Sequence, residues 1–182
     1  MRRVPVTRGK RRAREAGPAV PAAQAECNCP HLDPADWHEV ESDWSDIAFL
    51  RGSVNALLGV PVGFAAAWAR LEKRANALGA SIPEDPMFLL GSGRFRRPVL
   101  LEVEGPRPGA RGVIFPGGIA FSRLVSAPWG EMKRVVDDTN DAARAKYGRN
   151  PDDLWIWYVT CRLCSRERNF ETLVIAHYRT PP

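Results

Sequence analysis

The feature that most constrains this chain is its set of four cysteines, which are arranged as two close pairs. Cys27 and Cys29 form a C-x-C pair, and Cys161 and Cys164 form a C-x-x-C pair far along the chain. A short C-x-x-C turn can present two thiolates to one ion, and four thiolates suit tetrahedral zinc. The two pairs therefore predict one zinc site that ties an N-terminal segment to the end of the chain.

Other uses of four cysteines give the alternatives to this site. An iron–sulfur cluster also takes four thiolates and is the less favoured metal group. Two disulfides are disfavoured because nothing in the sequence indicates secretion and the cytoplasm keeps thiols reduced. Four thiolates leave no position on zinc for water, so the predicted site is structural rather than catalytic.

The charge of the chain is concentrated at its N-terminus. The formal net charge is +5 over 182 residues, yet residues 1–25 hold seven basic residues and one acidic residue, or +6, which leaves −1 for the rest. We expect residues 1–26 to be disordered. This basic tail gives one alternative function, a zinc-dependent interaction protein that makes non-specific contact with nucleic acid through residues 1–25.

Hydropathy indicates whether the chain can form a hydrophobic core and in which cellular compartment it is expected. The chain is 45% hydrophobic with six tryptophans, enough for one real core. No apolar run is long enough to span a bilayer, and the basic N-terminus lacks the apolar stretch of a secretory signal. We therefore expect a cytoplasmic protein with no membrane partner.

The pattern of apolar residues predicts an α+β fold with an internal repeat. Helices are expected over 63–78 and 128–147, and each is closed by a glycine, Gly79 and Gly148. Together with the strands, these helices give the order strand, helix, strand, strand twice. We predict duplicated units that form a pseudo-two-fold domain over 47–178, preceded by a zinc-tied N-terminal strap over 27–46. Strands are expected over 47–50, 54–60, 87–90, 99–104, 119–126, 154–160 and 172–178.

A ligand cleft is expected between the two repeated units. Trp155 and Trp157 alternate along a strand, so both rings face one side, and Phe121 is a candidate to join them in an aromatic wall. Glu102 and Glu104 share one face of an earlier strand, where a carboxylate could bind a cation or act as a general base. These aromatic and acidic side chains also have an ordinary interpretation, as core and as the wet face of a strand.

The segment Ile114-Phe115-Pro116-Gly117-Gly118-Ile119-Ala120-Phe121 resembles the start of the second half of GyrI-like (gyrase-inhibitor-like) small-molecule-binding proteins. The resemblance covers roughly 47–178 and implies a cleft for amphipathic or aromatic molecules. It also implies that some relatives hydrolyse reactive small molecules. Where that family carries Glu-x-Tyr, this chain has Trp155-Ile156-Trp157-Tyr158, so Tyr158 is expected at the ligand but the acid is missing. Glu102 or Glu104 would have to replace it.

The sequence therefore leads to two main functional hypotheses. The first is a small-molecule-binding domain, and the second is a hydrolase of a reactive or ester-like molecule that uses a cleft carboxylate as its base. The sequence contains no phosphate-binding loop, no G-x-S-x-G motif and no H-E-x-x-H pair.

Overall fold

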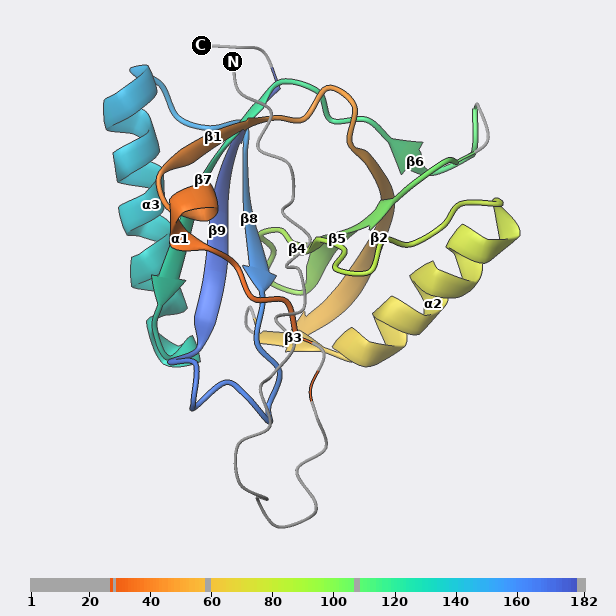
Figure 1. Cartoon of the computed structure of the whole chain (residues 1–182), viewed down its shortest axis with the longest axis horizontal. Coiled ribbons are helices and arrows are strands. Elements are labelled where there is room, and N and C mark those ends of the chain that lie inside the picture. The colour runs from red at the N-terminus through yellow and green to blue at the C-terminus, as the bar shows by residue number, and fades with distance from the viewer. Residues whose placement is uncertain (1–26, 28, 58–59, 107–108, 180–182) are drawn as a thin grey trace, which may run out of the picture.

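A computed structural model describes residues 27, 29–57, 60–106 and 109–179. The predictions for residues 1–26 lie outside these described residues. The chain folds into one nine-stranded sheet with two long helices, which confirms the α+β class (Figure 1). The helices are α1 Pro34–Trp37, α2 Phe64–Ala77, the 3-10 turn η1 Trp129–Glu131 and α3 Met132–Tyr147. The strands are β1 Val40–Asp43, β2 Ala48–Leu57, β3 Val60–Val62, β4 Phe88–Leu90, β5 Arg96–Val103, β6 Val113–Ile114, β7 Ile119–Ser126, β8 Asp153–Tyr158 and β9 Glu171–Tyr178.

The strand order of the sheet is β1-β7-β9-β8-β4-β5-β2-β3, with β6 beside β2, and all neighbouring strands are antiparallel. Read outward from the central β4–β8 pair, the order is β4-β5-β2 on one side and β8-β9-β7 on the other. The duplication of the two halves remains a prediction.

Both long helices lie on the same face of the sheet. The buried side of α2 packs with Leu90 of β4, and the buried side of α3 packs with Ile156 of β8. Leu90 and Ile156 are directly paired in the sheet, so they point to the same face. Figure 1 shows the two helices at opposite ends of this face.

The opposite face of the sheet is covered by the N-terminal strap, residues 27–46, rather than by a long helix. Trp37 and Trp44 of the strap are buried in the same apolar cluster as Trp155 and Trp157. The ring of Trp44 stacks on that of His177 with centroids 5.0 Å apart. The backbone N–H of Trp44 donates to Gly118 O at 2.9 Å. The strap is thus an integral layer of the core.

One sequence expectation about the strands was wrong. The sequence suggested that Gly52 would break the chain into two strands, but β2 runs unbroken through this residue. A Cβ added at Gly52 would lie 3.0 Å from Leu71 Cδ2. The glycine therefore allows α2 to pack closely on the strand instead of ending it.

Candidate metal centre and substrate pocket

The four cysteines meet at one point, although they come from distant parts of the chain. Their sulfur atoms all lie within 4.8 Å of one another, and the Cys161 and Cys164 sulfurs are 3.9 Å apart. Zinc–sulfur bonds of about 2.3 Å place the corners of a tetrahedron about 3.8 Å apart. The cluster could hold a metal ion with little rearrangement, as the sequence predicted.

Backbone N–H groups in the loop between β8 and β9 favour the thiolate form of Cys161. The N–H of Leu163 donates to Cys161 Sγ at 3.4 Å. Backbone N–H groups of Cys164 and Leu163 lower the pKa of the Cys161 thiol to about 7. Burial raises the pKa of Cys29 and that of Cys164, and thiol neighbours add to the effect at Cys29. Four crowded thiols cannot all ionise without a positive charge among them.

The strap is fastened beside this cluster by neutral and charged contacts. Arg168 Nη2 donates to Pro30 O at 2.7 Å, and Arg168 Nε donates to Glu171 Oε2 at 3.1 Å. Further along the strap, Ser122 Oγ donates to Trp37 O at 2.8 Å. These hydrogen bonds, beside the cysteine cluster, fix the strap to the β7–β9 half of the sheet.

The predicted aromatic wall exists in part but is covered. Trp155 and Trp157 share the strap-covered face and are only 8% and 4% exposed. Trp37 lies edge-on to Trp157 with ring centroids 5.9 Å apart. The surface expected to stack on a flat ligand is thus packed by the chain's own indole.

Two of the predicted ligand residues lie on the opposite face, which corrects the expectation that Phe121 joins the two tryptophans. Phe121 packs on the α3 side against Tyr147, with ring centroids 6.1 Å apart. Tyr158 also faces the helix side, where its ring centroid lies 6.5 Å from that of Trp129. Side chains of one strand alternate between the two faces of the sheet, and residues paired across strands share a face. Phe121 pairs with Ala176, which pairs with Leu154, the residue before Trp155. Phe121 and Tyr158 therefore lie on the face opposite to Trp155.

The two predicted acids lie on β5 or just after it, and β4 lies between β5 and the tryptophan-bearing strand β8. Glu102 lies on the strap-covered face by its alternation with buried Leu101, and its Oε2 accepts from the Met87 N–H at 2.9 Å. Glu104 is exposed, and its backbone pairs with that of Ser81. The described contacts of both acids are with the β4–β5 half, and their chemical role remains a prediction.

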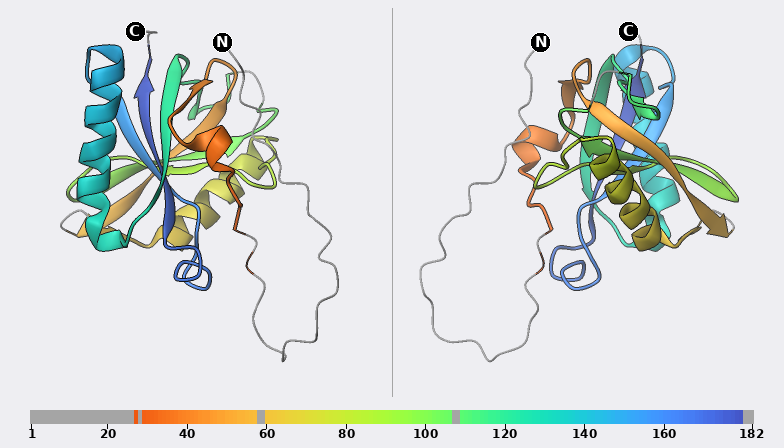
Figure 2. Two further views of the ribbon diagram at one scale, coloured as in Figure 1. Left: turned by 60° about the vertical axis from the view of Figure 1, so that its left-hand side comes forward. Right: turned by 90° about the vertical axis from the view of Figure 1, so that its right-hand side faces the viewer.

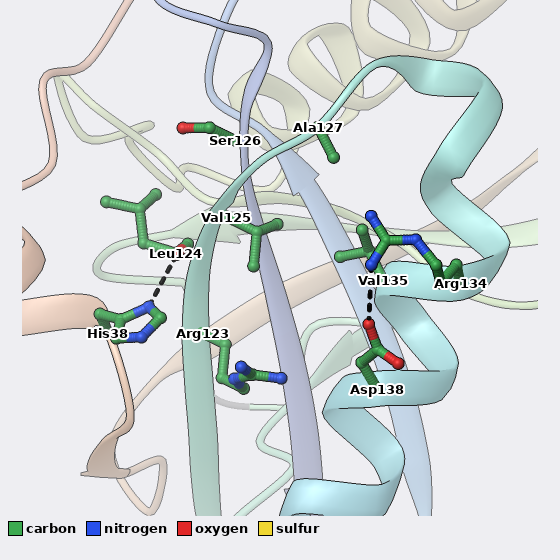
Figure 3. Close-up of a pocket in the computed structure, with 9 residues that line it drawn as sticks. All are labelled: His38, Arg123, Leu124, Val125, Ser126, Ala127, Arg134, Val135 and Asp138. Atoms are coloured by element: carbon green, nitrogen blue, oxygen red, sulfur yellow. Dashed lines mark hydrogen bonds and ion pairs between the residues drawn. The ribbon is translucent and has the colours of Figure 1, made fainter.

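A pocket of about 350 Å³ lies between β7 and α3. β1 pairs with β7 only from Ile119 to Ser122, so the rest of β7 is an open edge beside α3. The floor is apolar and the rim is charged (Figure 3). The lining residues are His38, Arg123, Leu124, Val125, Ser126, Ala127, Arg134, Val135 and Asp138.

Four ionisable side chains line this pocket. His38 Nδ1 lies 2.7 Å from Leu124 O, which fixes the imidazole at the rim. Arg123 is largely buried, and its Nε lies 3.4 Å from Glu39 Oε1 without the alignment of a hydrogen bond. Arg134 Nη1 donates to Asp138 Oδ2 at 3.1 Å. A histidine and two arginines thus surround a space large enough for a small molecule.

The sequence did not indicate this pocket. Its residues come from the strap, β7 and α3, and they form no short motif. In the sequence, His38 belongs to no H-E-x-x-H pair and no visible triad. Only the pairing of β1 with β7 brings His38 beside Arg123.

The fold and these two sites define an α+β protein with a cysteine cluster that could hold a metal ion and a pocket with a charged rim. Residues 20–177 match the family model described as bacterial hydrolase, so the chain belongs to this family. The match includes the strap and all four cysteines. No curated protein matches the chain. The GyrI-like assignment is not confirmed, and across the described segments no helix has the length and apolarity to cross a bilayer.

Proposed function

We propose that the protein hydrolyses a small carboxylic ester or a similarly electrophilic small molecule in the β7–α3 pocket. The observation that carries the proposal is the contact between His38 Nδ1 and Leu124 O at 2.7 Å. A carbonyl oxygen only accepts, so Nδ1 carries a proton, and in the neutral ring Nε2 then keeps its lone pair. The ring is thereby held as an oriented base at the rim of the pocket.

The reaction follows from this orientation. His38 Nε2 takes a proton from water while the water oxygen bonds to the substrate carbonyl carbon. The carbonyl oxygen becomes an oxyanion, which the guanidinium group of Arg123 stabilises. The bond from carbon to the leaving oxygen then breaks, and the imidazolium returns its proton to that oxygen. The products are a carboxylic acid and an alcohol.

The lining of the pocket favours a small substrate with an apolar part and a polarised oxygen. Leu124, Val125 and Val135 contribute apolar surface, and the volume suits a molecule of modest size. Arg134 is paired with two acids, Asp138 and Glu131, whereas Arg123 has a single acidic neighbour in the ion pairs of the described residues, Glu39, whose Oε1 lies 3.4 Å from its Nε. We therefore assign oxyanion binding to Arg123. This keeps the small-molecule binding expected from the sequence but moves it away from Trp155 and Trp157.

We further propose that the cysteine centre holds structural zinc. Tetrahedral four-sulfur sites favour zinc or iron, and the sulfur spacing suits a single ion. Four thiolates would complete the coordination, so the chemistry is assigned to the pocket instead of the metal. The ion would hold the strap, and the strap carries His38.

A panel of activated esters tests the proposed activity. We expect His38→Ala to lower kcat/KM by about 100-fold or more. His31→Ala is the matched control, because His31 is an exposed histidine on the same strap, and it should keep wild-type activity. Arg123→Met should lower kcat more than it raises KM, because the oxyanion forms only in the transition state.

The same assay separates this site from the acids predicted from sequence. If Glu102→Gln or Glu104→Gln abolishes turnover while His38→Ala does not, the base lies in the β5 strand and the proposed pocket is wrong. If no variant changes a measurable turnover, the activity lies elsewhere on the chain. Wild-type protein that turns over none of the esters contradicts the substrate class.

A further inference from the structure

An apolar patch lies at the far end of the sheet from the pocket. Seven large hydrophobic side chains are strongly exposed in the described part of the chain, and four of them gather here. Leu57, Val60, Val62 and Phe95 are 68%, 65%, 56% and 65% exposed, respectively. We call these four residues the β2–β3 patch.

Backbone contacts bring the four residues together at one end of β2. Leu57 pairs directly with Val60 in the β2–β3 ladder, and Val62 pairs with Asn55, two residues before Leu57 on β2. The carbonyl of Phe95 accepts from the Ala56 N–H at 2.8 Å, which places Phe95 beside the same end of β2. β3 is the last strand of the sheet, and Figure 2 (right) shows the end of β2 projecting past α2.

The surroundings of the patch carry only positive charge along the contributing strands. No acidic residue occurs between Asp46 and Glu72, or between Asp85 and Glu102. Arg94 lies 5.2 Å from the centroid of the Phe95 ring, and Arg96 Nε donates to Ser53 Oγ at 2.7 Å. Residues 26–182 as a whole carry 19 basic and 20 acidic residues, so this end is a local concentration of positive charge.

We propose that the β2–β3 patch binds an anionic lipid surface. Exposed apolar side chains that project from a fold and are flanked by arginines combine the two attractions that hold peripheral proteins on membranes. A second copy of the chain is a poorer occupant, because two patches face to face would oppose their arginines. Four side chains also offer less area than a stable dimer needs. The contact is peripheral and needs no spanning helix.

Co-sedimentation of the full chain with lipid vesicles tests this proposal. We expect binding to phosphatidylcholine vesicles that contain about one-third phosphatidylglycerol to be roughly tenfold or more stronger than binding to pure phosphatidylcholine. Raised salt should weaken it. Phe95→Ser and Arg94→Glu should each reduce binding several-fold. Phe115→Ser is the matched control, because Phe115 is 59% exposed at a different place, and it should leave binding unchanged.

Two further arms decide between occupants. A chain that lacks residues 1–25 should still bind anionic vesicles. If this deletion abolishes vesicle binding while the Phe95→Ser variant binds as wild type, the proposal is overturned in favour of the basic tail. Sedimentation without lipid should show no association that depends on Phe95. A dimer abolished by Phe95→Ser, or equal binding to neutral and anionic vesicles, also overturns it.

Discussion

The indole of Trp37 lies edge-on to the ring of Trp157, with the ring centroids 5.9 Å apart and the planes inclined by 68°. Trp37 is the last residue of helix α1 in the strap, whereas Trp157 lies in β8, far away in sequence. This contact joins the N-terminal strap to the centre of the sheet. It also explains why the tryptophans of β8 are part of the core and do not form an open ligand wall.

Removal of the Trp37 side chain should destabilise the whole fold. We expect Trp37→Ala to lower the free energy of unfolding by about 3–5 kcal/mol, the usual cost of removing a buried aromatic ring. Trp129→Ala is the control, because Trp129 is 48% exposed, and it should cost about 1 kcal/mol or less. Urea unfolding measures both values. Equal losses for the two variants would show that the strap contributes no more than a surface contact.

Loss of the metal should loosen the strap. We expect one metal ion per chain in purified protein and none in Cys161→Ser, measured by elemental analysis. Metal removal should increase hydrogen exchange in β1 and around Trp37, because Cys27 and Cys29 no longer anchor the strap. Ester turnover should fall in parallel, since His38 lies on the same segment. Unchanged protection of β1 after metal loss would contradict the anchoring role.

The thiols of the metal-free protein should differ in reactivity. Neighbouring backbone N–H groups lower the pKa of Cys161 to about 7, whereas burial raises that of Cys29. Because the thiolate is the nucleophile, iodoacetamide should label Cys161 first. The labelling rate should fall as the pH falls through about 7, where this thiolate gains its proton. Peptide mass spectrometry identifies the site, and first labelling at Cys29 would contradict the prediction.

The sequence was sufficient for the elements that depend on local pattern. The period of apolar residues located α2 and α3, and the segment predicted over 119–126 is β7. The pairing of distant cysteines followed from their chemistry, because four thiolates are most useful at one ion. These predictions need only neighbouring residues or a known ligand geometry.

Features that depend on which surfaces meet could not be predicted from the sequence. The acidic segment that contains Trp37 and Trp44 has no clear period, so its place over the Trp155 face depends on packing alone. Phe121 was assigned to the wrong face because the register between β7 and β8 is set through β9. The pocket arises where β1 stops pairing with β7, and no local residue pattern marks that point.

Gly118 and Gly117 provide a matched test of close packing at the strap. Both glycines have positive φ, 69° and 65°, so any side chain is strained at either position. A Cβ at Gly118 would also lie 1.9 Å from Tyr178 O, whereas a Cβ at Gly117 meets nothing within 4 Å. Gly118 O also accepts from the Trp44 N–H at 2.9 Å, so displacement of this residue would disturb the strap.

We therefore expect Gly117→Ala to cost about 1 kcal/mol, the price of left-handed backbone for alanine. Gly118→Ala should cost at least about 2 kcal/mol more, because the sheet must open beside Tyr178 to admit the methyl group. Urea unfolding compares the two variants, and the fluorescence of Trp44 should change only in Gly118→Ala. Similar costs for both would mean that β9 yields easily at this point and that the strap does not depend on close contact with it.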